Sequence, residues 1–393
     1  MDEEINVKHT QIKNPLRLMY GLGTLLAFSV AIPVYFTSTF LDAYMSTQWV
    51  GILYSLGSVL GIVGLAIMPR VLQKYGNYWT SISIAGILVL LLAALGFLSS
   101  SALIGIAFVA YSALLMVIVF SLDVFLESYS ADESTGGTRG AYLTLFNVAF
   151  VSSPVIAGFL LAGGDYWKLF SVSAIFMLMV MLVIAFKLKS FRDPYYENTP
   201  LLRTCKKVWK NKSIYKIFIA NFLLRFFFAL MVIYTPIYLN QQIGFDWDQI
   251  GIIFTIMLLP FIILEIPVGK IADKWLGEKE LLSAGFIIIS LSTAALFFIT
   301  STSMAVWAFA LFMTRVGASM IEIMTESYFF KQIDASNTQM IGFFRNTRPL
   351  AYLFAPIVAT VFLSFFEYQF LFLALGVVMF YGLRYSLTLK DTK

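Results

Sequence analysis

The chain has 393 residues and a formal net charge of +5, with 60% hydrophobic and 12% charged residues. An ordinary soluble domain has roughly 45–50% apolar and about 25% charged residues, so this composition excludes a water-soluble protein. A membrane-spanning helix needs about 20 apolar residues, and twelve spans therefore use roughly 240 residues. Too little chain remains for a large soluble catalytic domain. A membrane-embedded enzyme is an alternative that the lack of histidine and cysteine in the apolar runs opposes, so we expect the protein not to be an enzyme.

The chain opens with the polar stretch MDEEINVKHTQIKNP, which lacks the basic-then-apolar pattern of a cleavable signal. We therefore expect the first apolar run to stay in the mature protein. The one cysteine, Cys205, and the one histidine, His9, both lie in polar stretches. This excludes a disulfide framework, a Cys/His zinc site and a Cys-His nucleophile pair, so we expect no metal and no cofactor.

Twelve apolar runs follow, and each is long enough to be a spanning helix. A chain inside a membrane must satisfy its own backbone hydrogen bonds, which favours helices. The runs are, in chain order, 16–40, 49–68, 79–98, 102–121, 141–161, 167–186, 214–239, 250–271, 281–299, 304–323, 341–363 and 370–389. The sequence therefore predicts an all-α membrane protein with twelve transmembrane helices.

Basic residues are distributed unevenly between the two sets of loops. With the N-terminus inside, the outer loops contain one basic residue, Lys168, and the inner loops and tails hold most of the others. Because basic loops stay on the cytoplasmic side, we predict a multi-pass protein of the plasma (inner) membrane with both termini cytoplasmic. The same distribution argues against nucleic acid as a partner. The polar stretch 187–213 is predicted to be a cytosolic linker between an N-terminal bundle, 1–186, and a C-terminal bundle, 214–393.

The two halves match each other at an offset near 200 residues. The matched positions are Gly51 and Gly251, Lys74 and Lys274, and, at an offset of 202, Pro154 and Pro356. In the fourth and tenth spans, DVFLESY (123–129) lies opposite EIMTESY (322–328). This ordered series predicts two pseudo-symmetric six-helix bundles. Parallel halves of this kind are a transporter architecture, with the solute site near the midplane between them.

The inner loop after the eighth span, GKIADKWLGEK (269–279), resembles the Gly-x-x-x-Asp-Arg/Lys-x-Gly-Arg-Lys signature of the major facilitator superfamily. The resemblance covers nearly the whole chain and implies two bundles that rock around a central cavity lined mainly by spans 1, 4, 7 and 10. It also implies that Asp273, with Lys274 beside it, holds a cytosolic gate contact, for which Arg139 is the candidate partner. The alternative for both loop charges is a solvated turn.

Other positions either match the patterns of this superfamily or depart from them. In the signature loop, Gly269 and Gly277 are expected to let the backbone turn tightly. The corresponding loop of the first half, 69–78, has Gln73 at the position expected to be Asp. The segment SSPVIAG (152–158) is similar to the Gly-Pro motif of antiporters in the same superfamily, but its first glycine is missing.

Charged residues inside spans are costly and are usually paired or functional. The acids in or near the spans, which we regard as candidates for carrying a proton, are Asp123, Glu127, Glu265, Glu322 and Glu326. Two pairs of them are four residues apart, and each pair shares one helix face. Carboxylates this close repel each other, which favours one bound proton per pair. The alternative is that the acids form structural ion pairs with Arg139, Arg345 and Arg348.

Arg225 and Arg315 are predicted near the membrane midplane, where a guanidinium can bind a carboxylate or phosphate of an anionic solute. Alternatively, both arginines neutralise Glu265 and Glu322. Asn221 lies one turn before Arg225 and either completes a polar patch or bonds a neighbouring helix.

Aromatic residues are numerous, with 38 Phe, 20 Tyr and 7 Trp, and most of them are expected to face lipid or neighbouring helices. Tyr35 and Tyr234 are the candidates for lining a solute cavity, because both lie beside prolines in spans 1 and 7.

The sequence thus predicts a secondary transporter that acts as a monomer in membrane lipid and moves a small solute by alternating access. Proton coupling is expected, with antiport favoured. Within transport, the alternative is an anion exchanger or facilitative carrier in which Arg225 and Arg315 bind the solute. A non-transporting membrane sensor on the same scaffold is the alternative from another functional class.

Overall fold

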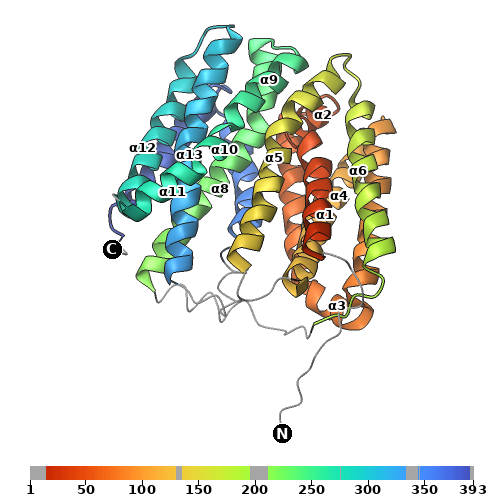
Figure 1. Ribbon diagram of the computed structural model, residues 1–393. Coiled ribbons are helices and arrows are strands. Elements are labelled where there is room, and N and C mark those ends of the chain that lie inside the picture. Colours follow the sequence, from red (N-terminus) through yellow and green to blue (C-terminus); the bar gives the residue numbers. More distant parts are fainter. Residues whose placement is uncertain are drawn as a thin grey trace.

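The computed structural model describes residues 15–129, 135–194, 211–274, 276–332, 344 and 346–389. The secondary structure of this part of the chain consists of helices, and the long ones run side by side (Figure 1). Eight stretches are long and apolar enough to cross a membrane, and three shorter apolar helices accompany them. This confirms the predicted all-α membrane fold, although length and composition alone select fewer than twelve spans.

The first half contains α1 (Pro15–Val34), α2 (Thr37–Asp42), α3 (Thr47–Phe97), α4 (Ser101–Tyr129), α5 (Thr135–Leu161) and α6 (Tyr166–Lys187). The predicted first span is divided between α1 and α2, and the Thr37 hydroxyl donates to the Pro33 carbonyl across the break at 2.7 Å. The predicted second and third spans form one element, α3, which bends at Gly76 with φ 75°. The predicted loop 69–78 is therefore helical up to this glycine.

The second half contains α8 (Lys212–Tyr238), the π-helical η2 (Leu239–Ile243), α9 (Trp247–Leu258), α10 (Pro260–Ile263), α11 (Glu265–Lys274), α12 (Glu278–Ala295), the 3-10 helix η3 (Leu296–Phe298), α13 (Met304–Gln332), α15 (Thr347–Leu363), α16 (Phe370–Tyr381) and α17 (Leu383–Ser386). The predicted eighth span is divided among α9, α10 and α11. Pro260 has no N–H for the Ile256 carbonyl, which accepts from the Leu259 N–H at 3.2 Å instead.

The signature segment 269–279 also differs from the predicted loop. Gly269 lies within α11, so it continues a helix rather than making a turn. Gly277 immediately precedes α12 and has φ −80°, which any residue can adopt. The expectation that both glycines permit a tight turn is therefore wrong for the backbone as the structure has it.

Two seams join the halves, one between α3 and α15 and one between α5 and α9. A Cβ atom added to Gly51 of α3 would lie 3.1 Å from the Pro356 carbonyl oxygen of α15. A Cβ atom added to Gly251 of α9 would lie 2.5 Å from the Pro154 carbonyl oxygen of α5. Gly51 thus packs against Pro356, and Gly251 packs against Pro154. These two prolines are repeat partners of each other, as the two glycines are. The predicted linker, 187–213, lies largely outside the described residues, and the domain boundaries stay a prediction.

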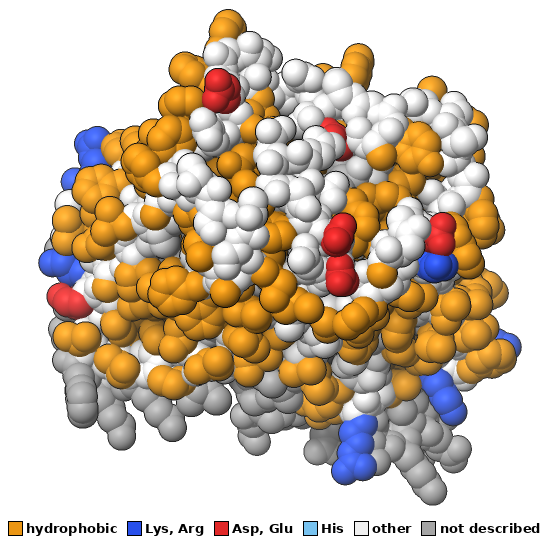
Figure 2. All heavy atoms as spheres, turned by 90° about the horizontal axis from the view of Figure 1, so that it is seen from above, with side chains coloured by type: hydrophobic (Ala, Val, Ile, Leu, Met, Phe, Trp, Pro, Cys, Tyr) orange, Lys and Arg blue, Asp and Glu red, His pale blue; other side chains and the backbone are white. Residues whose placement is uncertain are grey.

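Further contacts join the halves at one end of the bundle, which we call the closed end and define by Asp42, Gln241 and Trp247. The Gln241 side chain of η2 donates to the Asp42 carboxylate of α2. The Trp247 ring lies 5.9 Å from the ring of Phe36 and 6.0 Å from that of Tyr166. Figure 2 looks onto this end and shows acidic side chains among apolar and uncharged ones.

The sides of the bundle carry many large apolar side chains that are exposed in the isolated chain. Examples are Leu90 of α3, Ile106 of α4, Phe159 of α5 and Phe186 of α6. Exposed apolar surface of this extent is typical of protein that contacts a membrane or a partner. Lipid contact accounts for it here, because α3, α4 and α6 are long and apolar enough to span and α5 contains one of the three shorter apolar helices.

Gly76→Ala is expected to destabilise the fold by about 1–2 kcal/mol, because a left-handed conformation is unfavourable for a residue with a Cβ atom. The new methyl group would also lie 2.6 Å from Oδ2 of Asp193. The other carboxylate oxygen, Oδ1, accepts from the Asn77 N–H at 2.6 Å, which holds Asp193 in place. Thermal unfolding in detergent measures the effect as a lower midpoint. Gly21→Ala in α1 is the control, since its Cβ would have no neighbour within 4 Å among the described residues outside its own turn of helix. Equal midpoints for both variants would contradict the prediction.

Candidate functional site

An ion pair links α8 to α13 in the second half. Nη1 of Arg225 lies 2.8 Å from Oε1 of Glu322, and these side chains are 19% and 25% exposed. Nη2 of the same arginine lies 3.9 Å from Oε1 of Glu326, one turn further along α13. Opposite charges attract more strongly where water is partly excluded. The structure thus places Arg225 where it neutralises Glu322.

The arginines predicted as partners of the acids are placed differently. Arg348 is exposed, and its Cζ atom lies 6.0 Å from the ring of Tyr352. Arg345 lies outside the described residues. The ion-pair partner of Glu322 in the structure is therefore on α8, at Arg225, rather than near the start of α15.

Arg315 of α13 is buried, with 1% of its surface exposed. Its Cζ atom lies 4.9 Å from the ring of Phe227 and 5.5 Å from the ring of Phe228, both on α8. Aromatic faces attract a guanidinium, but they do not accept its N–H groups as a carboxylate does. Within the described part of the chain, its Nε and Nη1 atoms have no hydrogen-bond partner. Among the side chains that the structure describes, no carboxylate forms an ion pair with Arg315.

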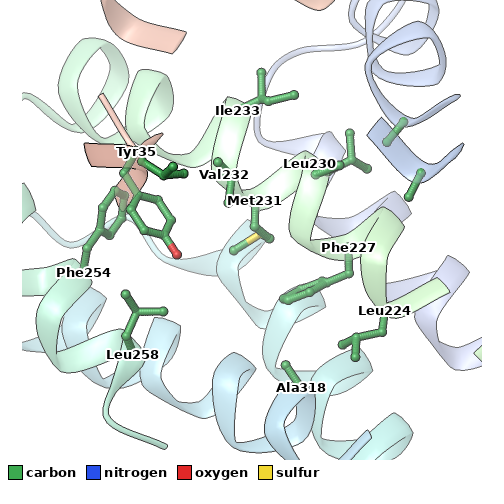
Figure 3. Close-up of a cluster of buried hydrophobic side chains, with 14 of the residues drawn as sticks. Tyr35, Leu224, Phe227, Leu230, Met231, Val232, Ile233, Phe254, Leu258 and Ala318 are labelled. Atoms are coloured by element: carbon green, nitrogen blue, oxygen red, sulfur yellow. The ribbon is translucent and has the colours of Figure 1, made fainter. Parts of the chain in front are cut away.

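Two tyrosines from different halves lie next to Arg315. Tyr35, at the junction of α1 and α2, and Tyr352 of α15 are both within electrostatic interaction range of the guanidinium. The Tyr35 ring lies 5.1 Å from the ring of Phe254 of α9. Figure 3 shows Tyr35 within a cluster of buried side chains that includes labelled residues of α8 and α9. Side chains of predicted spans 1, 7 and 10, three of the four spans that the family resemblance assigns to the cavity, thus lie near one another at Arg315, together with Tyr352 of α15.

A second group of tyrosines adjoins the first. Tyr54 of α3 lies within interaction range of Tyr111 of α4, Tyr352 and Tyr234. Tyr234 is fully buried, and its hydroxyl donates to the Pro356 carbonyl at 3.3 Å, so it belongs to the seam between the halves. In the sequence, Tyr54, Tyr111 and Tyr352 lack the proline two residues away that distinguishes Tyr35 and Tyr234, so nothing singles them out as site residues.

The remaining predicted residues are placed as follows. The Asn221 amide donates to the Thr347 hydroxyl of α15 at 2.8 Å, which matches the interpretation that it bonds a neighbouring helix. Asp123 lies half-buried on α4. The structure does not describe the side chains of Glu127, Arg139, Glu265, Asp273, Lys274 and Arg345. The gate contact between Asp273 and Arg139 therefore stays a prediction.

Comparisons with known proteins agree with this architecture. The family model described as Major Facilitator Superfamily matches residues 18–338 and, in a second match, residues 217–390. No curated protein matches the chain in sequence.

Solved structures match the fold over almost its whole length. A mutant of the nucleoside transporter NupG superimposes with a TM-score of 0.75 and 13% identity, covering 95% of this chain and 100% of that one. An auto-inhibited POT family peptide transporter gives a TM-score of 0.77 and 10% identity, covering 96% and 98%. The POT family transporter PepTSo gives 0.74 and 11%, covering 95% and 97%. Identities this low show a shared fold, and the family match goes further: the chain belongs to the major facilitator superfamily of membrane transporters.

Proposed function

We propose that this protein is a secondary transporter that moves a small solute by alternating access and couples this movement to protons through Glu322. Export of the solute in exchange for protons is the favoured direction. The observation that supports the proposal is the partly shielded ion pair between Arg225 and Glu322. A carboxylate in this position has two alternative partners, the guanidinium and a proton, and either one neutralises it.

The position of Glu322 fits proton exchange with one side of the membrane at a time. It lies about 27 Å along α13 from Met304, by the rise of 1.5 Å per residue in a helix. The glycine seams and the contacts of Trp247 lie nearer the closed end. In this conformation these contacts therefore separate Glu322 from the membrane face at the closed end. Rocking of the bundles would separate the seams, and movement of α8 relative to α13 would release Glu322 from Arg225 to take up a proton.

The test is Glu322→Gln, which mimics the protonated carboxyl. In liposomes with an internal pH dye, a panel of organic anions, sugars and cationic dyes first identifies a solute whose addition moves protons. Glu322→Gln is expected to abolish accumulation of that solute driven by a pH gradient but to retain its exchange at equal pH. Full gradient-driven movement by the variant would exclude Glu322 as the proton carrier and move attention to Glu265 or Asp123.

The orientation of the protein in the membrane is part of the proposal. The closed end is expected to face outward, because the loops there are poor in lysine and arginine. In a Cys205→Ser background, single cysteines in Asp42→Cys, Asp165→Cys and Asp246→Cys variants should react with an impermeant thiol reagent added outside cells. Reaction only with reagent added on the cytoplasmic side would show that the closed end faces the cytoplasm.

One observation favours a second candidate function, a carrier without proton coupling that exchanges anions. The guanidinium of Arg315 is buried, and its Nε and Nη1 atoms have no hydrogen-bond partner among the residues that the structure describes, so it has capacity to bind a solute directly. Such a carrier would show solute exchange that moves no protons and that is unaltered in Glu322→Gln. The dye measurement above therefore separates the two functions.

A further inference from the structure

The two arginines near the middle of the second half have different surroundings. Arg225 is paired with Glu322 and lies near Glu326, so its positive charge is balanced by the protein. Arg315 is more deeply buried, and among the described side chains no acid pairs with it. Glu322 acts on Arg315 electrostatically, but Glu322 forms its ion pair with Arg225. A buried cation that no described acid pairs is unfavourable unless a ligand supplies a counter-charge. The imbalance at Arg315 indicates a site for an anion.

The aromatic surroundings of Arg315 indicate what else the anion carries. The rings of Phe227 and Phe228 flank the guanidinium from α8. Tyr35 and Tyr352 lie within electrostatic interaction range of it, and Tyr54 lies within that range of Tyr352. Faces and edges of such rings pack favourably against another aromatic ring, and phenol hydroxyls at their ends can bond a polar substituent.

The tyrosines also come from both halves of the chain. Tyr35 and Tyr54 belong to the first half, while Arg315 and Tyr352 belong to the second. A ligand that bridges them contacts both bundles at once, so its binding free energy can favour one arrangement of the bundles over another. This is the property that a transported solute needs, and a structural anion held within one bundle would lack it.

We propose that the solute of this transporter is an organic anion with an aromatic ring, whose acidic group is bound by Arg315 and whose ring lies among Tyr35, Tyr54 and Tyr352. This inference rests on the proposed transport function and names its substrate class. A carboxylate, sulfonate or phosphate group fits the guanidinium equally well in charge and geometry. A cationic solute would be repelled by Arg315, because Glu322, which could attract it, is already neutralised by Arg225.

Binding to the full chain in lipid nanodiscs, measured by titration calorimetry, tests the solute class without any variant. The probes are benzoate and benzenesulfonate, with acetate as an anion without a ring, benzyl alcohol as an uncharged counterpart and benzylamine as a cationic one. The two aromatic anions are expected to bind at least ten-fold more tightly than the other three. Equal binding of benzylamine or benzyl alcohol, or no binding of either aromatic anion at millimolar concentration, would overturn the inference.

Variants then test whether Arg315 is the anchoring residue. Arg315→Gln is expected to weaken benzoate binding at least ten-fold, whereas Arg384→Gln, at an exposed arginine of α17, should leave it unchanged. Arg315→Met removes the unbalanced charge, so its thermal midpoint without ligand should be no lower than that of the unaltered protein. A large fall in that midpoint together with retained benzoate binding would make Arg315 a structural residue.

These outcomes are separate from those that test proton coupling. Binding in nanodiscs involves no gradient, so it succeeds or fails whether or not Glu322 carries a proton. If the aromatic anions do not bind but another solute moves protons in liposomes, the substrate class is wrong and the transport function stands. If they bind but no solute moves protons, the coupling is wrong and the site at Arg315 stands.

Discussion

Gly251→Leu is expected to abolish transport while the protein still folds. A Cβ atom at this position would lie 2.5 Å from the Pro154 carbonyl oxygen and 3.0 Å from the Gly158 Cα atom. Both are backbone atoms of α5, which cannot rotate aside as a flexible side chain can. A leucine there would hold α5 and α9 apart, so the conformation with the closed end sealed would become inaccessible. Lipid can still surround the separated helices, because their outer faces are unchanged.

Accessibility at the closed end measures this effect. Phe36 is fully buried beside Trp247, so a cysteine in Phe36→Cys should label slowly in a Cys205→Ser background. Adding Gly251→Leu is expected to speed that labelling by ten-fold or more and to reduce solute exchange in liposomes to background. Gly86→Leu in α3 is the control, because its Cβ would lie 3.5 Å from the flexible Met181 side chain. Unchanged labelling and exchange in Gly251→Leu would show that this seam does not separate during transport.

The second large effect is expected at the ion pair between Arg225 and Glu322. Arg225→Gln leaves Glu322 without this partner, and Glu322→Gln leaves Arg225 with the longer 3.9 Å contact to Glu326. Loss of a charged hydrogen bond that is shielded from water costs about 1–3 kcal/mol. Arg225→Gln combined with Glu322→Gln leaves no unpaired charge. The double variant should therefore regain most of the stability that either single variant loses.

Stability and transport should respond differently to the double variant. Thermal unfolding in detergent should show the recovery, while accumulation driven by a pH gradient should stay abolished because no carboxyl remains at position 322. If the pair were purely structural, the double variant would recover both its stability and its accumulation of solute driven by a pH gradient. Additive losses of stability in the double variant would contradict the pairing seen at 2.8 Å between Arg225 and Glu322.

The internal repeat was the part of the fold that the sequence predicted best. Matching residues identified Gly51 with Gly251 and Pro154 with Pro356 as equivalent positions. Equivalence alone does not reveal contact, because an internal repeat says nothing about how the two copies face each other. The structure adds that each glycine packs against the opposite half at a proline carbonyl.

Element boundaries were predicted less well, for local physical reasons. Apolar content places the spans but not the turns between them, so the helical extension of α3 up to Gly76 was missed. The division of the eighth span follows from Pro260, which lacks the N–H that would continue the helix. The presence of this proline was visible in the sequence, but whether the helix bends, kinks or restarts there depends on its neighbours.

The candidate site was partly predictable. Arg225, Arg315 and Glu322 stood out because charges are rare in apolar runs. Their pairing was not predictable, since it depends on how each helix is rotated about its axis and on where α8 meets α13. With 20 tyrosines in the chain, Tyr54 and Tyr352 carried no individual signal in the sequence. Their role in the proposed site came from the electrostatic interaction of Tyr352 with Arg315 and of Tyr54 with Tyr352.

Proton movement in liposomes tests the central claim most directly. Unaltered protein is reconstituted with an internal pH dye, and benzenesulfonate is added outside, because this anion stays charged at all accessible pH values and does not cross lipid by itself. We expect its addition to change internal pH, and an imposed pH gradient to drive its accumulation, with neither effect in protein-free liposomes. Movement of benzenesulfonate that is saturable, depends on the protein and leaves internal pH unchanged would contradict proton coupling in this transporter.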